Sequence, residues 1–223
     1  MFNSKSKILV IAPHLDDEAL GMGGTISYLK SKGCSVHVVF AAFRKYNGRK
    51  TKSSINNDKK ESMLAKKILG YDKISFLNLS DERLQFDFNK LIMGLEKIVK
   101  KEKPDTIFCC FYGDNNQDHR SVFDASRIVF RWKNNVKNVF LYETPSSTEI
   151  SPAILNNQFV PNFYINIEKY LENKIKAFYC YKSEISASPS SRNKEGIINY
   201  AKFRGMSSGL KAAEAFMSLR QVI

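Results

Sequence analysis

The sequence of 223 residues has few of the features that mark disulfide-rich, metal-thiolate or membrane-spanning proteins. It contains four cysteines and no CxxC pair, and Cys109 and Cys110 are adjacent within an apolar stretch, which excludes a disulfide framework and a cysteine metal site. The apolar runs at residues 8–12 and 107–112 fall far short of the ~20 residues that span a bilayer, and the first is shorter than the core of a signal peptide. The sequence therefore predicts a protein of a reducing compartment, the cytoplasm.

The chain has fewer acidic than basic residues, 22 against 35, which gives a net charge of +13. An excess of this kind can attract nucleic acid, anionic lipid or an acidic substrate. The lysines are scattered, however, and the short clusters at residues 59–60, 66–67 and 100–101 lie where helices with a solvated face are expected. No basic stripe interleaved with aromatic residues accompanies them, so the sequence does not predict a nucleic-acid-binding protein.

Apolar runs bounded by turn residues alternate with segments of helical period, as is typical of an α/β fold. We expect a Rossmann-like, mainly parallel sheet with helices on both faces and a helical C-terminal extension. The expected strands are residues 8–12, 36–43, 74–79, 106–112 and 139–142, and the expected helices are residues 19–32, 58–69, 89–101 and 120–132. A long loop with three prolines is expected at residues 144–163, followed by helical spacing over residues 167–178 and a helix-rich tail from about residue 193.

Two of the expected strands end in clusters of polar residues. In an open parallel sheet, ligands bind beyond the carboxyl ends of the strands, so these residues are the first candidates for a functional site. The first strand is followed by Pro-His-Leu-Asp-Asp-Glu at residues 13–18, and the fourth by a polar run that ends in Asp118, His119 and Arg120. The chain has only three histidines, and His14 and His119 are two of them. Their placement favours one shared site over two unrelated polar turns.

His14, Asp17 and His119 predict a metal site with two imidazoles and one carboxylate. His14 and Asp17 are three residues apart where a strand turns into a helix, so one turn brings both side chains to the same side. Three protein ligands leave a coordination position open, as a catalytic zinc requires, and the same set suits Fe(II), so the sequence leaves the metal open between the two. Asp16 projects differently from Asp17 and is the candidate general base. In the alternative interpretation, Asp16, Asp17 and Glu18 only stabilise a helix N-terminus.

The glycines at positions 21, 23 and 24 are not interpreted as a dinucleotide-binding motif. They lie inside the helix that follows the acidic loop and lack the GxGxxG spacing directly after a strand. The three carboxylates of the acidic loop would also repel a pyrophosphate. We interpret these glycines as positions of close packing between helix and sheet.

Two motifs carry a resemblance to a known family. Ile-Ala-Pro-His-Leu-Asp-Asp-Glu at residues 11–18, with Gly-Gly-Thr at 23–25, and Asp-His-Arg at 118–120 together resemble the PIG-L (LmbE-like) family of metal-dependent N-acetyl-sugar deacetylases. The family motif is usually His-Pro-Asp-Asp-Glu, and Leu15 stands here at the position of the proline. The resemblance covers about residues 7–145. We therefore expect residues 1–145 to be the catalytic unit and residues 146–223 to be a loop and helical extension packed on the same domain.

The resemblance implies zinc ligands at His14, Asp17 and His119 and a general base at Asp16, in agreement with the interpretation of the residues themselves. Many members carry a further histidine three residues before the last ligand, and this position is Asn116 here. An amide can donate a hydrogen bond to a developing oxyanion, but it cannot donate a proton. Asp16 is therefore expected to carry the proton from water to the leaving amine by itself.

Three further residues are expected near this set. Asp81 lies just past the third strand and matches an aspartate that binds sugar hydroxyls in the family. Asp118 and Arg120 are expected to be outer partners of the ligands, since ligating histidines usually donate their other N–H to an oxygen acceptor.

The implied activity is removal of the acetyl group from an N-acetylated amino sugar within a nucleotide sugar, a lipid-linked sugar or a glycoside. An amidase that acts on a different amide is one alternative, and an inactive scaffold, suggested by Asn116, is another. A basic nucleic-acid-binding module is a third class, and its affinity would fall steeply with salt. The sequence leaves the oligomeric state open, a homo-oligomer included.

Overall fold

The computed structural model describes residues 1–44, 51–131, 134–152, 154 and 157–222, which are arranged around one mixed sheet. The sheet has seven strands in the order β3-β2-β1-β4-β5-β7-β6. They are β1 (Lys7–Ala12), β2 (Ser35–Phe43), β3 (Lys73–Ser80), β4 (Thr106–Cys110), β5 (Asn138–Tyr142), β6 (Phe163–Asn166) and β7 (Ala213–Arg220). The first five run parallel, and β7 pairs antiparallel with both β5 and β6.

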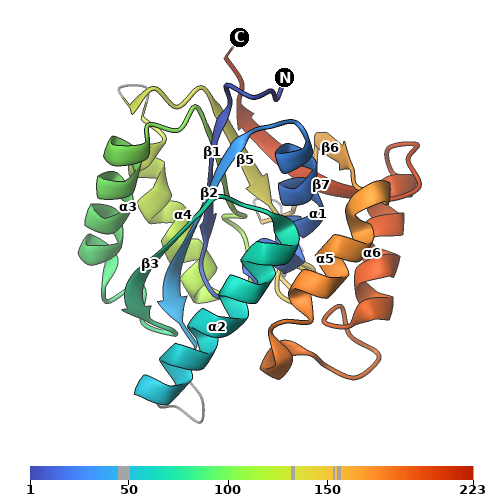
Figure 1. Cartoon of the computed structure of the whole chain (residues 1–223), viewed down its shortest axis with the longest axis horizontal. Helices are drawn as coiled ribbons and strands as arrows, with labels where there is room; N and C mark the ends of the chain where they lie inside the picture. Colours follow the sequence, from blue (N-terminus) through green and yellow to red (C-terminus); the bar gives the residue numbers. More distant parts are fainter. Residues whose placement is uncertain (45–50, 132–133, 153, 155–156, 223) are drawn as a thin grey trace.

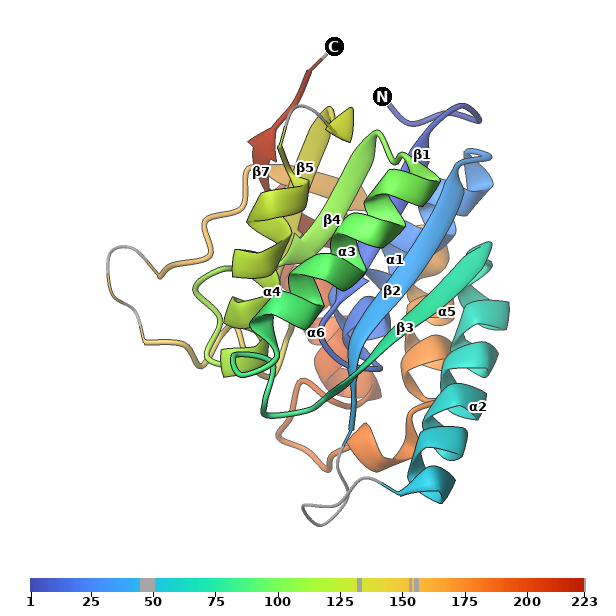
Figure 2. The same ribbon diagram turned by 90° about the vertical axis from the view of Figure 1, so that its left-hand side faces the viewer.

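Helices cover both faces of this sheet (Figure 1). They are α1 (Asp17–Ser31), α2 (Lys52–Leu69), α3 (Phe88–Glu102), α4 (Gln117–Val129), α5 (Leu171–Phe178) and α6 (Lys194–Met206), with the short 3₁₀ helices η2 (Glu168–Tyr170) and η3 (Lys182–Glu184). Helices α3 and α4 lie on one face, and α1, α2, α5 and α6 lie on the other, as the turned view in Figure 2 also shows. None of the helices in the described residues has the length and hydropathy that a bilayer crossing demands.

The predicted fold class is confirmed. The five expected strands are β1 to β5. Strands β1, β2, β4 and β5 are buried along most of their length and appear in the sequence as short apolar runs, whereas β3 at the edge of the sheet is only partly buried. The helix-rich tail is correct only as far as α6, since residues 213–220 form strand β7. Ala213 and Glu214 have little intrinsic preference for a strand. They form one here because β7 pairs with both β5 and β6.

Helix α2 begins at Lys52, six positions before the predicted start at residue 58. The Thr51 hydroxyl accepts a hydrogen bond from the backbone N–H of Ser54, and the Ser54 hydroxyl accepts one from the backbone N–H of Thr51 at 2.9 Å. The two bonds together form a capping box. The first turns of α2 are polar, so they carry no apolar period that would have revealed the helix.

Gly21 and Gly24 allow α1 to lie close to its neighbours, as the sequence predicts. A Cβ atom on Gly21 would lie 2.5 Å from Cδ2 of Tyr142 on β5, and one on Gly24 would lie 2.8 Å from Cβ of Ile167. Real Cβ atoms do not approach other atoms so closely, so a larger residue at either position would force its neighbours to shift.

Replacing Gly21 by alanine is expected to lower the free energy of unfolding by about 1–3 kcal/mol. Tyr142 cannot easily move aside, because it is buried and its hydroxyl donates to the carbonyl of Ile11 at 2.8 Å. Gly23→Ala is the matched control, since its Cβ would lie 3.3 Å from Cγ of Lys174, a much milder contact than that at Gly21. Urea unfolding of the two variants measures the difference, and equal midpoints would contradict the packing argument.

Candidate metal centre

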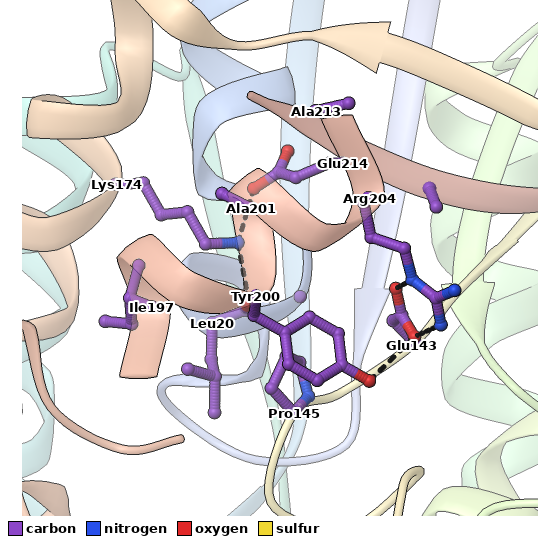
Figure 3. Close-up of a pocket in the computed structure, with 12 residues that line it drawn as sticks. Leu20, Glu143, Pro145, Lys174, Ile197, Tyr200, Ala201, Arg204, Ala213 and Glu214 are labelled. Carbon is purple, nitrogen blue, oxygen red and sulfur yellow. Dashed lines mark hydrogen bonds and ion pairs between the residues drawn. The ribbon is translucent and has the colours of Figure 1, made fainter. Parts of the chain in front are cut away.

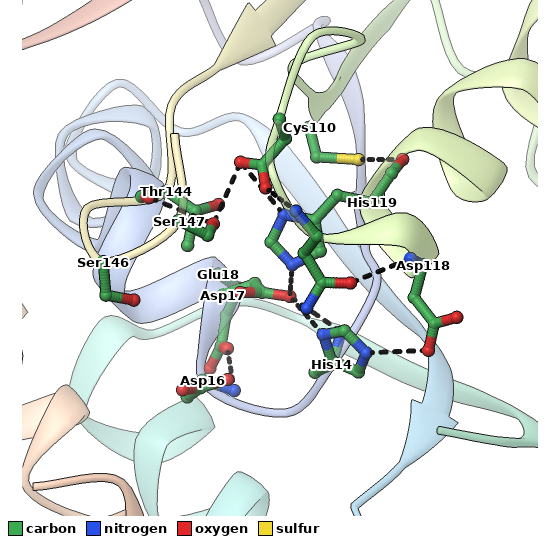
Figure 4. A network of polar contacts seen from close by, with 12 residues as sticks. His14, Asp16, Asp17, Glu18, Cys110, Asp118, His119, Thr144, Ser146 and Ser147 are labelled. Atoms are coloured by element: carbon green, nitrogen blue, oxygen red, sulfur yellow. Dashed lines mark hydrogen bonds and ion pairs between the residues drawn. The ribbon is translucent and has the colours of Figure 1, made fainter. Parts of the chain in front are cut away.

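The residues of the predicted metal set lie together at the carboxyl end of the sheet. His14 follows β1, Asp17 begins α1, and His119 lies in the first turn of α4. One ligand atom from each lies within 4.8 Å of the others, and all three residues are buried. Asp17 Oδ2 is 3.3 Å from His14 Nδ1 and 3.3 Å from His119 Nε2 (Figure 4). The same oxygen accepts the backbone N–H of His14 at 2.8 Å, which fixes the carboxylate toward both imidazoles.

Each imidazole has a second carboxylate on its other nitrogen. His14 Nε2 is 3.2 Å from Asp118 Oδ2, and His119 Nδ1 is 3.3 Å from Asp114 Oδ2 without the angle of a full hydrogen bond. Asp118 is itself held by two backbone N–H groups from the turn after β3, at 2.6 and 3.2 Å. Carboxylates in such places set the orientation and tautomer of ligating histidines.

Asp81 lies on the open side of His14. Its Oδ1 is 3.1 Å from His14 Nε2, and its side chain is 21% exposed, against 1% for Asp118. His14, Asp81 and Asp118 thus form a second group of closely spaced donor atoms. Both carboxylates approach Nε2, the nitrogen that faces away from Asp17, but only Asp81 also lines the cleft.

The surrounding carboxylates change the proton affinity of both imidazoles. Burial lowers the pKa of His119, but Asp17 and Asp114 outweigh it and raise that pKa to about 9. Burial also lowers the pKa of His14, and hydrogen bonds to nearby carboxylates, Asp118 first, raise it well above its usual value. Burial alone would raise the pKa of Asp17, yet the two imidazoles lower it below its usual range. The same negative charge that favours protons here would stabilise a divalent cation.

The donor set fits a metal of the zinc or Fe(II) type. Two imidazole nitrogens and one carboxylate oxygen are ligands that both ions accept, and three ligands leave positions open for other molecules. The set is buried and is supported by outer carboxylates, as bound metals require.

Asp16 precedes α1 in a backbone conformation that residues other than glycine rarely adopt, with φ of 122° and ψ of −27°. It occupies the N-cap position, but its side chain makes no capping hydrogen bond. The carboxylate faces a cleft and forms an ion pair with Arg192. Burial raises the pKa of Asp16 to about 7, although the charge of Arg192 opposes this shift.

The site opens on a cleft of about 350 Å³. This volume lies in the range of small-molecule sites, about 300–1,000 Å³. The cleft is lined mainly by polar and charged side chains, which are His14, Asp16, Asp17, Arg44, Asp81, Asn116, His119, Thr144, Ser146, Ser147, Glu184 and Arg192. Such a lining suits a polar substrate such as a sugar.

Asn116 lines this cleft as the N-cap of α4. Its Oδ1 accepts the backbone N–H of Asp118 at 2.8 Å, so its Nδ2 is the group that could donate to a bound molecule. Arg120 contacts the neighbouring loop, where its guanidinium donates to the carbonyl oxygens of Asp114 and Asn115 at 2.6 and 2.7 Å. Arg120 therefore supports the loop that carries Asp114.

Several residues of the site are not predicted from the sequence, among them Arg44, Asp114 and Arg192. Asp114 lies in the polar run after the fourth strand, but nothing in its spacing distinguishes it from its neighbours. Arg192 belongs to a segment far along the chain that has no regular periodicity. Only the folded chain brings it to Asp16.

A second polar cluster lies where α5, α6 and β7 meet α1 (Figure 3). Lys174 Nζ donates to Glu214 Oε1 at 2.5 Å and to the carbonyl of Leu20 at 2.7 Å, while Arg204 forms an ion pair with Glu143. The cavity between them is about 10 Å³, which is room for about one water molecule. The cluster therefore ties the C-terminal part of the chain to α1 and does not hold a substrate.

One family of known proteins is similar to this chain in sequence. The model of the PIG-L family, described as GlcNAc-PI de-N-acetylase, matches residues 9–130. The uncharacterized deacetylase YaiS of Escherichia coli (strain K12) is 31% identical over 187 residues, which are 81% of this chain and 93% of that protein.

Solved structures share the fold at lower sequence identity. N,N'-diacetylchitobiose deacetylase from Pyrococcus horikoshii superposes with a TM-score of 0.76 and 24% identity, over 96% of this chain and 84% of its own. GalB, the 4-carboxy-2-hydroxymuconate hydratase from Pseudomonas putida KT2440, has a TM-score of 0.75 and 19% identity, over 98% of each chain. The fold therefore serves more than one reaction, and the choice between reactions depends on the site.

Proposed function

This chain belongs to the PIG-L family, and on that premise we propose that it is a zinc-dependent hydrolase that removes the acetyl group from an N-acetylated amino sugar. The observation that carries the proposal is the meeting of His14, Asp17 and His119 beside Asp16 at one polar cleft. The deacetylase names of the relatives support the same reaction. The products are acetate and a free amine.

His14, Asp17 and His119 would hold the metal through Nδ1, a carboxylate oxygen and Nε2. When bound, zinc supplies a Lewis acid for the acetamide carbonyl and the attacking water. Asp16 takes a proton from that water as its oxygen adds to the carbonyl carbon. When the carbon–nitrogen bond breaks, Asp16 gives the proton to the leaving amine, as one carboxylate can do in both steps.

Asn116 and Asp81 are assigned to the substrate. The Nδ2 of Asn116 donates a hydrogen bond to the oxyanion that develops on the carbonyl oxygen, since its Oδ1 is already engaged by the helix. Asp81, which is partly exposed beside His14, accepts a hydrogen bond from a sugar hydroxyl. Asp118 and Arg120 do not contact the substrate. Asp118 orients His14, and Arg120 holds the loop after β4 through the Asp114 carbonyl.

The catalytic unit in this proposal is larger than residues 1–145. Ser146, Ser147, Glu184 and Arg192 line the cleft, so the later part of the chain contributes to the site as well as packing on the sheet. A cytoplasmic location is part of the proposal, as expected from a cysteine pattern that does not form a disulfide framework.

Acetate and amine release from a panel of N-acetylated sugars tests the proposal directly. The purified protein is expected to contain about one zinc per chain, to lose turnover after dialysis against a chelator, and to regain it with zinc or Fe(II). Free amine is measured by a fluorogenic amine reagent, and acetate by an enzymatic assay.

Three outcomes would contradict it. Turnover that survives complete removal of metal would exclude metal dependence. Cleavage of bulkier amides with no release of acetate would favour the amidase alternative. A protein that binds one zinc yet releases no acetate from any sugar of the panel would favour an inactive scaffold.

A further inference from the structure

Arg192 connects the candidate base to the C-terminal part of the chain. Its Nη2 forms a short ion pair with Asp16 Oδ2 and lies 2.7 Å from Glu184 Oε2. Its Nη1 donates to Ser146 Oγ at 3.0 Å, and its Nε donates to the Glu184 carbonyl at 3.0 Å. The guanidinium also lies 5.6 Å from the ring of Phe178 on α5. These contacts hold the planar group on several sides, so it is rigid before any substrate binds.

Glu184 is itself held from a second direction. Its Oε1 is 3.0 Å from Arg44 Nη1, and Arg44 contacts Asp58 and Glu61 of α2 at 2.8 and 2.5 Å. The network of Arg192, Glu184 and Arg44 thus spans the cleft from α2 to the loop before α1. It fixes Arg192 to the body of the fold.

Asp16 does not make the contact that its position usually provides. An Asp at the N-cap commonly accepts the backbone N–H of the second or third helical residue. In this chain that bond is absent, and φ of Asp16 is 122°. A residue in so rare a conformation persists only where its surroundings hold it, and Arg192 supplies such a contact to the carboxylate itself.

We propose that Arg192 is a positioning residue that holds Asp16 by Oδ2 and thereby turns Oδ1 toward the reacting water and amine. The proposal rests on the deacetylase function proposed above. A role in substrate binding is less compatible with the contacts, because the guanidinium is already engaged by Asp16 and Glu184. Arg192 also lies outside residues 9–130, so a segment beyond the family match orients the base of the family motif.

The Arg192→Ala variant, loaded with zinc, tests this role. We expect kcat to fall by about 100-fold, as misplacement of a reacting group by about 1 Å can cause, with KM changed less than about threefold and zinc content unchanged. Guanidinium ion at low millimolar concentration should restore part of kcat by filling the vacated place. A crystal structure of the variant should show the Asp16 carboxylate turned to a backbone N–H at the start of α1.

Arg204→Ala is the matched control. Arg204 is another partly buried arginine in an ion pair, with Glu143, and it lies away from the cleft. This variant is expected to lose stability but to keep kcat, and guanidinium ion should not raise its activity. A kcat of Arg192→Ala within threefold of the parent, or an unmoved Asp16 in its structure, would overturn the proposal. If the parent protein deacetylates no sugar, the proposed function is wrong. The crystal structure of Arg192→Ala then still tests whether Arg192 holds the Asp16 carboxylate in place.

Glu184→Gln provides a second test if Arg192→Ala does not fold. Glu184 is 25% exposed, so its replacement is tolerated more easily, but it loosens Arg192. We expect a several-fold fall in kcat with KM and zinc content preserved. A parental kcat in this variant, together with an Asp16 that stays in place, would overturn the proposal in the same way.

Discussion

The His119→Ala variant is expected to lose both the metal and the deacetylase activity. His119 Nε2 is one of three donor atoms, and the variant would leave only His14 and Asp17. Replacing an outer partner of a ligand already lowers metal affinity by about 10–100-fold, so removal of a ligand should lower it further. Elemental analysis of the purified variant and competition with a chromogenic chelator measure the loss.

His37→Ala is the control for this variant. His37 is the third histidine of the chain, it is also buried, and its Nε2 lies 2.9 Å from Ser75 Oγ on the next strand. It has no contact with the candidate ligands among the described residues, so His37→Ala should retain the metal. If His119→Ala bound zinc as tightly as the parent protein, His119 would not be a ligand and the proposed centre would be wrong.

The parallel part of the fold could be predicted because its signal is local. Strands β1, β2, β4 and β5 are short and mostly apolar, β3 keeps several apolar residues among polar ones, and the helices between the strands are long enough to be recognised. Strand β7 could not be predicted, because Glu214 interrupts its apolar pattern. That carboxylate is buried only because it accepts hydrogen bonds from Lys174 and from the backbone N–H groups of Gly24 and Thr25. Its partners lie far away in the sequence, so no local pattern indicates that a charged residue can occupy a buried strand.

The candidate site likewise contains residues that the sequence predicts and residues that only the tertiary structure reveals. His14, Asp17 and His119 could be predicted to meet, since they follow neighbouring parallel strands and topology alone brings such strand ends together. Arg192 could not, because it reaches Asp16 through the packing of the segment after α5. The sequence can thus predict the groups that would bind the metal and move the proton, whereas the group that orients the base depends on tertiary structure.

The Asp16→Asn variant is expected to keep its metal and lose its turnover. Asparagine has nearly the shape of aspartate and can still accept a hydrogen bond from Arg192, so the fold and the three candidate ligands should be undisturbed. It cannot take a proton from water at neutral pH, and loss of a general base lowers kcat by about 10²–10⁴-fold. Single-turnover deacetylation together with zinc analysis measures the two properties separately.

Asp72→Asn is the matched control for Asp16→Asn, because Asp72 pairs with Lys30 far from the cleft lining and should not affect kcat. The comparison with His119→Ala is the decisive one. A ligand and a base differ in this test. A variant that lacks a ligand should lose both bound metal and turnover, whereas a variant that lacks the base should lose turnover alone. Equal loss of zinc from Asp16→Asn and His119→Ala would mean that Asp16 helps to hold the metal, and the proton transfer would then require another residue of the cleft.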